Sequence, residues 1–202
     1  MKIVKLETLI DAGSFTKTHD WKVIYKHIEE SIKKIEWPAG TGSFTLYDES
    51  GKKRGKGSGV KPIKVDFMKK LASLGWDLET PLDIATVRRP GAMDATYRVQ
   101  DKFFCVEWET GNVSSSHRAI NKMALGILKG VLIGGILIVP TRTMYRYLTD
   151  RVGNLTELEP YFPLWSSLNI KEGFLAVMAV EHDAVSRSVP RIPKGTNGRA
   201  LK

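Results

Sequence analysis

The spacing of apolar side chains predicts helices and strands that alternate along the whole chain. In several segments apolar residues recur every three or four positions, which is the spacing of an amphipathic helix. We expect helices over residues 20–37, 62–74, 115–129 and 143–151. Asp20 is the expected N-cap of the first helix, Ser114 or Ser115 is the expected N-cap of the third, and Gly130 ends that third helix.

Shorter apolar runs, some of them alternating with polar residues, predict the strands of a sheet. We expect strands over residues 43–47, 81–87, 94–99, 103–109, 136–139 and 174–180, with turns at residues 88–91 and 100–101. The tail from Ser186 onward contains prolines, glycines and several cations, so we expect it to be irregular. No repeat or domain boundary is visible, and residues 1–202 are therefore expected to form one α/β domain.

Carboxylates gather on and beside one of these strands. Glu107 and Glu109 are two residues apart, so they point to the same face of the strand over residues 103–109 as Cys105 does. The residues that point to the opposite face, into a core, are Phe104, Val106 and Trp108. Asp94 lies on the preceding strand, and it faces Glu107 if the two strands pair.

Three converging carboxylates favour Mg²⁺, which takes a few carboxylates and several waters as ligands. Such an ion stabilises phosphoryl charge and lowers the pKa of a bound water, and a neighbouring carboxylate accepts the proton. The alternative is that Glu107 and Glu109 are solvent-facing strand residues with cationic partners. The turn after Glu109 leads into a helix that carries Arg118 and Lys122, which places cations and amides beside the acids, as a phosphodiester substrate requires.

The charge balance points to a polyanionic partner. The chain has a formal net charge of +9 and a sequence pI of about 9.6, which favours nucleic acid or an anionic surface. Gly51–Gly59 is a flexible basic loop in this interpretation, either a solvated turn or an arm that contacts phosphates. The first ten residues lack the apolar core of a signal peptide, and the longest apolar run is too short to cross a bilayer. The lack of a spanning segment predicts no membrane partner, and with Cys105 as the single cysteine we expect no internal disulfide and a reducing cytoplasm.

At the carboxylates the sequence resembles a known family. Residues 107–122, which read EWETGNVSSSHRAINK, resemble the active-site strand and following helix of the BamHI restriction endonucleases. Further matches run in order between Trp37 and Gly198, over residues 62–64, 81–84, 147–152, 157–162 and 189–195. The resemblance implies a PD-(D/E)xK nuclease fold, in which a mixed central sheet is flanked by helices on both sides. It also implies a Mg²⁺-dependent homodimer that encloses double-stranded DNA.

The resemblance assigns roles to the acids. Asp94 and Glu107 match the metal ligands of the family, together with the backbone carbonyl of Trp108, and Glu79 matches a further carboxylate of the site. Glu109 takes the position at which most relatives of the superfamily carry lysine, and in the BamHI family it is the favoured general base. Two Mg²⁺ ions are then expected to bracket the attacking water and the leaving 3′ oxygen.

The resemblance also assigns DNA contacts. The positions that read the major groove in the family are matched by Asn112, Ser114, Arg118, Asp150 and Arg151. Arginine pairs with guanine, aspartate accepts from cytosine N4 and asparagine serves adenine, and the full match implies the palindrome GGATCC, cut after the first G to leave 5′ overhangs. Further expected contacts to DNA come from Lys64, Lys122, Gly195 and Asn197.

The sequence departs from the family at several positions. Leu128-Lys129 and Pro163 stand where the family has charged dimer contacts, so we expect an apolar stripe to support the dimer instead. The chain stops at Lys202, before the C-terminal helix of BamHI, and a shorter isoschizomer is expected to be the nearer relative. Asn197 replaces an acid in the segment that reaches the minor groove, and His117 is expected to face either DNA or the dimer partner.

Two other functions compete with this interpretation. A non-catalytic basic DNA-binding module would have no need of several acids near the phosphates. A metal-dependent hydrolase of small phosphates would explain the acids, but it would give no role to the neighbouring cations or to the net charge of +9.

Overall fold

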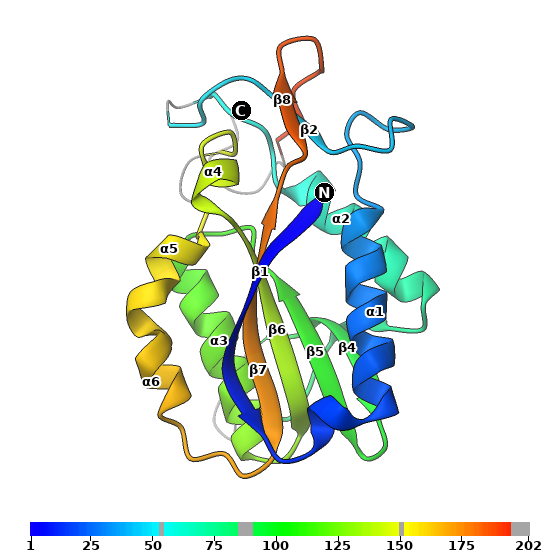
Figure 1. Cartoon of the computed structure of the whole chain (residues 1–202), viewed down its shortest axis with the longest axis vertical. Coiled ribbons are helices and arrows are strands. Elements are labelled where there is room, and N and C mark those ends of the chain that lie inside the picture. Colours follow the sequence, from blue (N-terminus) through cyan, green and yellow to red (C-terminus); the bar gives the residue numbers. More distant parts are fainter. Residues whose placement is uncertain (53–54, 85–90, 150–151, 195–202) are drawn as a thin grey trace.

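A six-stranded mixed sheet forms the centre of the molecule (Figure 1). The computed structural model describes residues 1–52, 55–84, 91–149 and 152–194. In their order across the sheet the strands are β1 (Lys2–Ala12), β7 (Gly173–Glu181), β6 (Leu132–Pro140), β5 (Lys102–Trp108), β4 (Met93–Val99) and β3 (Asp77–Thr80). Strands β5, β6 and β7 are parallel to one another, whereas β1, β4 and β3 pair antiparallel with their neighbours.

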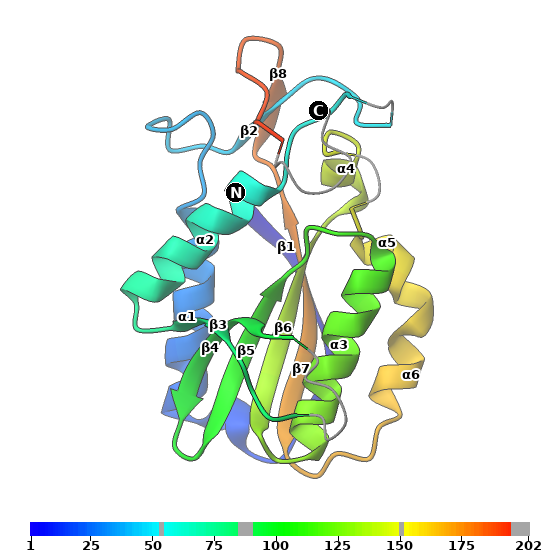
Figure 2. The same cartoon turned by 180° about the vertical axis from the view of Figure 1, so that it is seen from behind.

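Helices cover both faces of this sheet (Figures 1 and 2). One face is covered by α1 (His19–Lys33) and α2 (Lys61–Ser73), and the other by α3 (Val113–Leu128), α5 (Leu155–Leu158) and α6 (Phe162–Ser166). Two hydrophobic cores result, one on each face, and every residue of β6 between them is buried. The expected α/β fold, with helices on both sides of a mixed sheet, is therefore confirmed.

Smaller elements gather at one end of the sheet, the upper end in Figure 1. There β2 (Thr45–Tyr47) pairs in parallel with β8 (Ala184–Ser186). The helix α4 (Arg142–Tyr145) follows β6 at the same end. Two short 3-10 helices complete the described elements, η1 (Phe15–Lys17) and η2 (Glu159–Tyr161). No helix in the described ranges is long and apolar enough to cross a membrane.

The three long helices were expected, but two of their N-caps differ from the sequence prediction. Thr18 caps α1 in place of Asp20, because its side chain accepts a hydrogen bond from the Trp21 N–H at 3.2 Å. Asn112 caps α3 in place of Ser114 or Ser115, since its Oδ1 accepts from the Ser115 N–H at 3.2 Å. Both caps have extended backbone, as an N-cap requires, whereas the predicted residues already lie inside the helix or at its start.

The helix predicted over residues 143–151 is wrong beyond its first turn. The helix α4 ends at Tyr145, and the chain then turns to bond with the segment around residues 51–58. The Gly51 N–H donates to the Arg146 carbonyl at 2.8 Å, and the Ser58 N–H donates to the Tyr147 carbonyl at 2.7 Å. These backbone bonds outcompete a local helical pattern, and residues 150–151 lie outside the described structure.

The strand predicted over residues 81–87 is also misplaced. Strand β3 lies earlier, over Asp77–Thr80, and residues 81–84 are neither helix nor strand. The remaining residues of that prediction, and the turn expected at residues 88–90, lie outside the described structure. Ser186 belongs to β8, so the irregular tail begins one residue later than expected, and residues 187–194 have no helix or strand.

The loop expected to be flexible is tightly packed at both of its described ends. Gly51, Gly57 and Gly59 are buried, and a Cβ at Gly51 would lie only 1.5 Å from the Leu148 carbonyl oxygen. A Cβ at Gly59 would lie 2.0 Å from the Pro193 carbonyl oxygen. Glycine is therefore required here for close approach of three backbone segments, and residues 53–54 between them are not described.

Candidate active site

Strands β4 and β5 bring two buried carboxylates together at the end of the sheet. Their antiparallel register pairs Ala95 with Val106, which places Asp94 opposite Glu107, as the sequence predicted. The two residues are 9% and 8% exposed. The backbone N–H of Trp108 donates to Asp94 Oδ2 at 2.8 Å, so the next residue of β5 fixes the orientation of this carboxylate.

Each of these acids is paired with a lysine from a helix. Lys64 of α2 donates from Nζ to Asp94 Oδ1 at 2.5 Å. Lys122 of α3 places Nζ 2.5 Å from Glu107 Oε1 and also donates to the Ala92 carbonyl at 2.9 Å. Two carboxylates that are buried side by side repel each other, so positive charges close to them are needed to stabilise the pair. The two lysines supply those charges from the two helical layers on either face of the sheet.

The Glu107 carboxylate has both a perturbed pKa and a buried oxygen that contacts an ammonium group. Burial, followed by the negative charge of Asp94, raises the pKa of Glu107 to about 7, although Lys122 and Lys64 act in the opposite direction. Oε1 of Glu107 is buried, and among the described residues it contacts the Lys122 ammonium in an ion pair. A buried carboxylate oxygen of this kind fits a divalent cation, whose ligands are carboxylate oxygens and waters.

Glu109 lies just beyond the end of β5, in the turn that leads to α3. The Gly111 N–H donates to Glu109 Oε1 at 2.5 Å, and this bond fixes the carboxylate beside the turn. Burial raises the pKa of Glu109, and the backbone N–H groups of Gly111 and Thr110 lower it in part. The charges of Asp94 and Lys64 also act on this carboxylate, which places it beside the acid pair.

The structure does not bring Glu79 into this group. Its backbone has a φ of +50° at the position where β3 runs beside β4, and its side chain is exposed. Among the described residues, no group of three or more acidic, histidine or cysteine side chains lies close enough to hold a metal ion. The expected convergence of three carboxylates is therefore wrong for this arrangement, in which two acids are buried together and Glu109 lies next to them.

The residues expected to contact DNA fall into three sets. Asn112, Ser114 and Arg118 are exposed near the start of α3, with the Asn112 side chain engaged as the N-cap. Lys64 and Lys122 are instead paired with acids, and the Lys122 side chain is only 8% exposed. The expected contacts that lie outside the described residues are Asp150, Arg151, Gly195 and Asn197.

His117 packs within the helical layer. Its ring meets that of Tyr161 edge-on at 4.5 Å and lies 5.4 Å from that of Trp165. It is half-buried, and its expected position facing either DNA or the dimer partner stays a prediction. Trp108 packs against Phe67 at 4.8 Å in the core, as expected.

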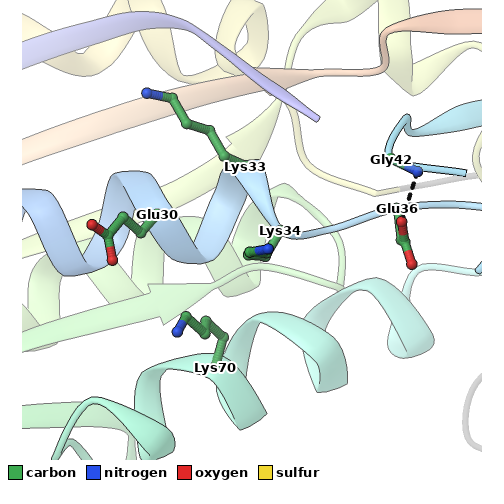
Figure 3. A pocket seen from close by; sticks show the side chains of 6 residues that line it. All are labelled: Glu30, Lys33, Lys34, Glu36, Gly42 and Lys70. Atoms are coloured by element: carbon green, nitrogen blue, oxygen red, sulfur yellow. Dashed lines mark hydrogen bonds between the residues drawn. The ribbon is translucent and has the colours of Figure 1, made fainter. Parts of the chain in front are cut away.

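A separate hollow lies between α1, α2 and the loop that follows α1 (Figure 3). It has a volume of about 470 Å³ and is lined by Glu30, Lys33, Lys34, Glu36, Gly42 and Lys70. The Glu36 carboxylate is occupied by the backbone N–H groups of Gly40 and Gly42, at 2.6 and 2.8 Å. This hollow shares no residue with the acid pair, so it is not part of the candidate active site.

The perturbed pKa of Glu107 predicts a pH dependence of stability in the metal-free protein. The folded state keeps the proton up to about pH 7, whereas the unfolded state loses it near pH 4.5. Stability therefore falls as pH rises through this window, by about 3 kcal/mol. Urea unfolding in EDTA at pH 4.5 and pH 8 should show this loss in the wild type and not in Glu107→Gln. Equal pH dependence in both proteins would contradict the buried, protonated state of Glu107.

The fold is that of a known class of nuclease. The crystal structure of restriction endonuclease BglII complexed with a DNA 16-mer is similar to this chain, with a TM-score of 0.65. The match covers 91% of this chain and 79% of BglII at 14% sequence identity, which shows the fold alone. The chain therefore has the fold of a restriction endonuclease, with the acid pair at the end of its sheet.

Sequence comparisons identify the family within this class. Residues 1–199 match the family described as Restriction endonuclease BamHI. The type II restriction enzyme OkrAI of Oceanobacter kriegii is 50% identical over 202 residues, 100% of both chains. BamHI of Bacillus amyloliquefaciens is 34% identical over 185 residues, 88% of this chain and 83% of BamHI. The chain therefore belongs to the BamHI family of restriction endonucleases, and it is a type II site-specific deoxyribonuclease.

Proposed function

We propose that this enzyme hydrolyses double-stranded DNA at the palindrome GGATCC, after the first G, in a reaction that requires Mg²⁺. The observation that carries the proposal is the buried pair of Asp94 on β4 and Glu107 on β5, with Glu109 beside it in the turn that leads to the cation-bearing helix α3. In a protein of net charge +9, these acids are explained if they bind a metal ion that in turn contacts the phosphodiester.

The metal would be held by Asp94 and Glu107, with the backbone carbonyl of Trp108. Oε1 of Glu107 supports this assignment, because it is a buried carboxylate oxygen that already contacts one cation, the Lys122 ammonium, in whose place a divalent ion can bind. The ion would supply stabilisation of negative charge on the phosphate and a lowered pKa for a bound water. Glu79 remains a ligand predicted by the family resemblance, with no support from its exposed side chain.

Glu109 is the proposed general base. Burial raises the pKa of Glu109, and a raised pKa makes its carboxylate a stronger proton acceptor at neutral pH than a free glutamate. The Gly111 N–H occupies Oε1, which leaves the remaining lone pairs of the carboxylate for the water that attacks the phosphodiester.

The paired lysines set the charge of the site before a cation arrives. Lys64 neutralises Asp94, and Lys122 neutralises Glu107 once its carboxyl loses its proton near pH 7, so the buried acids are tolerated in the metal-free protein. A divalent cation must compete with both ammonium groups for the same oxygens. The two lysines are then available for phosphate oxygens, which is consistent with the DNA contacts predicted for them from the sequence.

Recognition of the palindrome is proposed for the start of α3 and for segments that lie outside the described structure. Asn112, Ser114 and Arg118 are exposed at the edge of the site, where they are available to base edges. The same role is proposed for Asp150 and Arg151, and a minor-groove contact for Gly195 and Asn197. The relatives of this family come from bacteria, and we propose a bacterial cytoplasm as the place of action.

A palindrome calls for a two-fold symmetric enzyme, and we propose a homodimer that uses α3 and α6. Exposed apolar side chains lie on these helices and on η2 between α5 and α6: Leu125, Leu128, Tyr161 and Leu164. The helices pack side by side, because the Trp165 Nε1–H donates to Asn121 Oδ1 at 2.9 Å. Together these side chains form an apolar surface suited to a second copy.

Leu164→Asp tests this surface. Leu164 is 62% exposed, so the substitution should leave the fold intact, while each copy would carry a desolvated carboxylate into the interface. We expect the dimer to weaken by about 100-fold or more, as measured by analytical ultracentrifugation. Val4→Asp is the matched control, on the exposed side of β1. Equal dissociation of both variants, or of neither, would place the interface elsewhere.

The specificity is tested by digesting a plasmid in Mg²⁺ and sequencing the cut ends. The expected ends begin with GATC in every case, with no cutting in EDTA. Cuts at another sequence would refute the proposed base contacts and leave the class of enzyme intact.

A further inference from the structure

The chain segment that follows residue 149 returns to the candidate active site at Gly153. The Gly153 N–H donates to the Gly111 carbonyl at 2.9 Å, and the start of the segment is held where the Thr149 N–H donates to the Ser58 carbonyl at 2.9 Å. The next residue, Asn154, is fully buried, and its N–H donates to Glu157 Oε2 at 3.3 Å. The position of Gly153 is thus fixed by its own hydrogen bond and by the buried residue that follows it.

Gly111 connects this contact to the catalytic carboxylate. The carbonyl of Gly111 accepts from Gly153, while its N–H donates to Glu109 Oε1 at 2.5 Å. A shift of Gly153 therefore moves the turn that holds Glu109. Gly111 itself has no room for a side chain, since a Cβ there would lie 2.9 Å from Glu109 Oε1 and 3.0 Å from Ser115 Oγ.

Gly153 is close enough to α3 to exclude any side chain. A Cβ at this position would lie 2.5 Å from Ser116 Oγ, and 3.2 and 3.3 Å from the Val113 Cα and N atoms. Ser116 Oγ is fully buried and has no hydrogen-bond partner among the described residues. The backbone of Gly153 does not have the positive φ that favours glycine, so space alone requires glycine here.

We propose that Gly153 is a positioning residue, which holds the Glu109 carboxylate in place through Gly111. The inference rests on the proposed role of Glu109 as general base. In the sequence, Gly153 lies two residues after Arg151, to which the family resemblance assigns a base contact.

The test is a set of substitutions with a built-in rescue. Gly153→Ala pushes the segment away from α3, and a displacement of about 1 Å at a catalytic group costs about 100-fold in rate. Ser116→Ala removes the atom that the new Cβ would strike, so the double variant should recover to within about fivefold of wild type. Ser116→Ala alone should cut at the wild-type rate. Gly111→Ala should slow cleavage as well, and Ser116→Ala should not rescue it, because the clash there involves Glu109 and Ser115.

Two quantities are measured for each variant: the single-turnover rate at saturating enzyme, and the Kd for the same duplex without metal. The inference predicts that Gly153→Ala loses rate with less than about a threefold change in Kd. An unchanged rate would overturn it. A parallel loss of rate, affinity and melting temperature without rescue by Ser116→Ala would also overturn it, since that pattern reports a damaged fold.

The inference and the proposed function can fail separately. The wild-type cut site is read from sequenced ends, and the variants are then assayed on whichever site the wild type cuts. If Glu109→Gln kept the wild-type rate while Gly153→Ala lost it with rescue, Gly153 would position some other group, and the inference would be wrong. A cut site other than GGATCC would change the proposed specificity alone.

Discussion

Glu109→Gln is expected to slow cleavage by about 1000-fold while leaving DNA affinity within a few-fold of wild type. The substitution keeps the shape of the side chain, and the amide oxygen still accepts the hydrogen bond that Gly111 donates. It removes the basic carboxylate whose pKa is raised by burial, so the proton of the attacking water has no acceptor. The measurement is single-turnover cleavage of a duplex that contains GGATCC, with binding followed separately by fluorescence anisotropy.

Glu172→Gln is a suitable control for this prediction, because Glu172 is exposed at the opposite end of the sheet, next to Gly13. It should cut at the wild-type rate. Cleavage by Glu109→Gln within tenfold of wild type would show that Glu109 is not the general base and that another group activates the attacking water.

Asp94→Asn is expected to have a comparable or larger effect on rate, but for a different reason. The amide is a poor ligand for Mg²⁺, and loss of the ion removes several kcal/mol of charge stabilisation, which corresponds to about 1000-fold or more in rate. Removing the charge also frees Lys64, whose Nζ lies 2.5 Å from Asp94 Oδ1. We therefore expect this variant to bind DNA more tightly than wild type when no metal is present.

The expected rise in affinity for DNA distinguishes the loss of a metal ligand from damage to the fold. Asp77→Asn is the control, since Asp77 is exposed on β3 and should change neither quantity. A variant Asp94→Asn that cut DNA at the wild-type rate would exclude Asp94 as a metal ligand. Weaker DNA binding in EDTA would show that the acid supports the DNA-binding surface instead.

The part of the site that lies on regular structure could be predicted from the sequence. The alternation along residues 103–109 fixes the face of Glu107, and a tight turn at residues 100–101 fixes the register that places Asp94 opposite. The alternation of side chains along a strand and the position of a tight turn can both be read from neighbouring residues. The pairing of these two acids therefore follows from the local sequence. The long amphipathic helices α1 and α3 follow from the same kind of argument.

The partners of the acids could not be predicted in this way. Lys64 and Lys122 reach the carboxylates from two helices on opposite faces of the sheet, and nothing local to either lysine distinguishes it from a surface lysine. Their positions beside the acids depend on tertiary packing. The same is true of Gly153, whose need for glycine arises only where its segment meets α3.

Edge strands and short helices were missed for a related reason. Strand β1 is an edge strand in which most residues are only partly buried, so its apolar pattern is weak. The helices α5 and α6 are only four and five residues long, and so short a segment carries little periodicity. In the segment after α4, backbone bonds to residues 51 and 58 overrode a pattern that locally favoured a helix.

The most direct test of the account is to locate the metal by anomalous diffraction from crystals of the enzyme–DNA complex soaked in Mn²⁺. The account predicts an anomalous peak bound by the carboxylates of both Asp94 and Glu107, with Lys64 and Lys122 displaced from them. A peak elsewhere, or the two lysine pairs intact beside an empty site while the same crystals cleave their DNA, would contradict it.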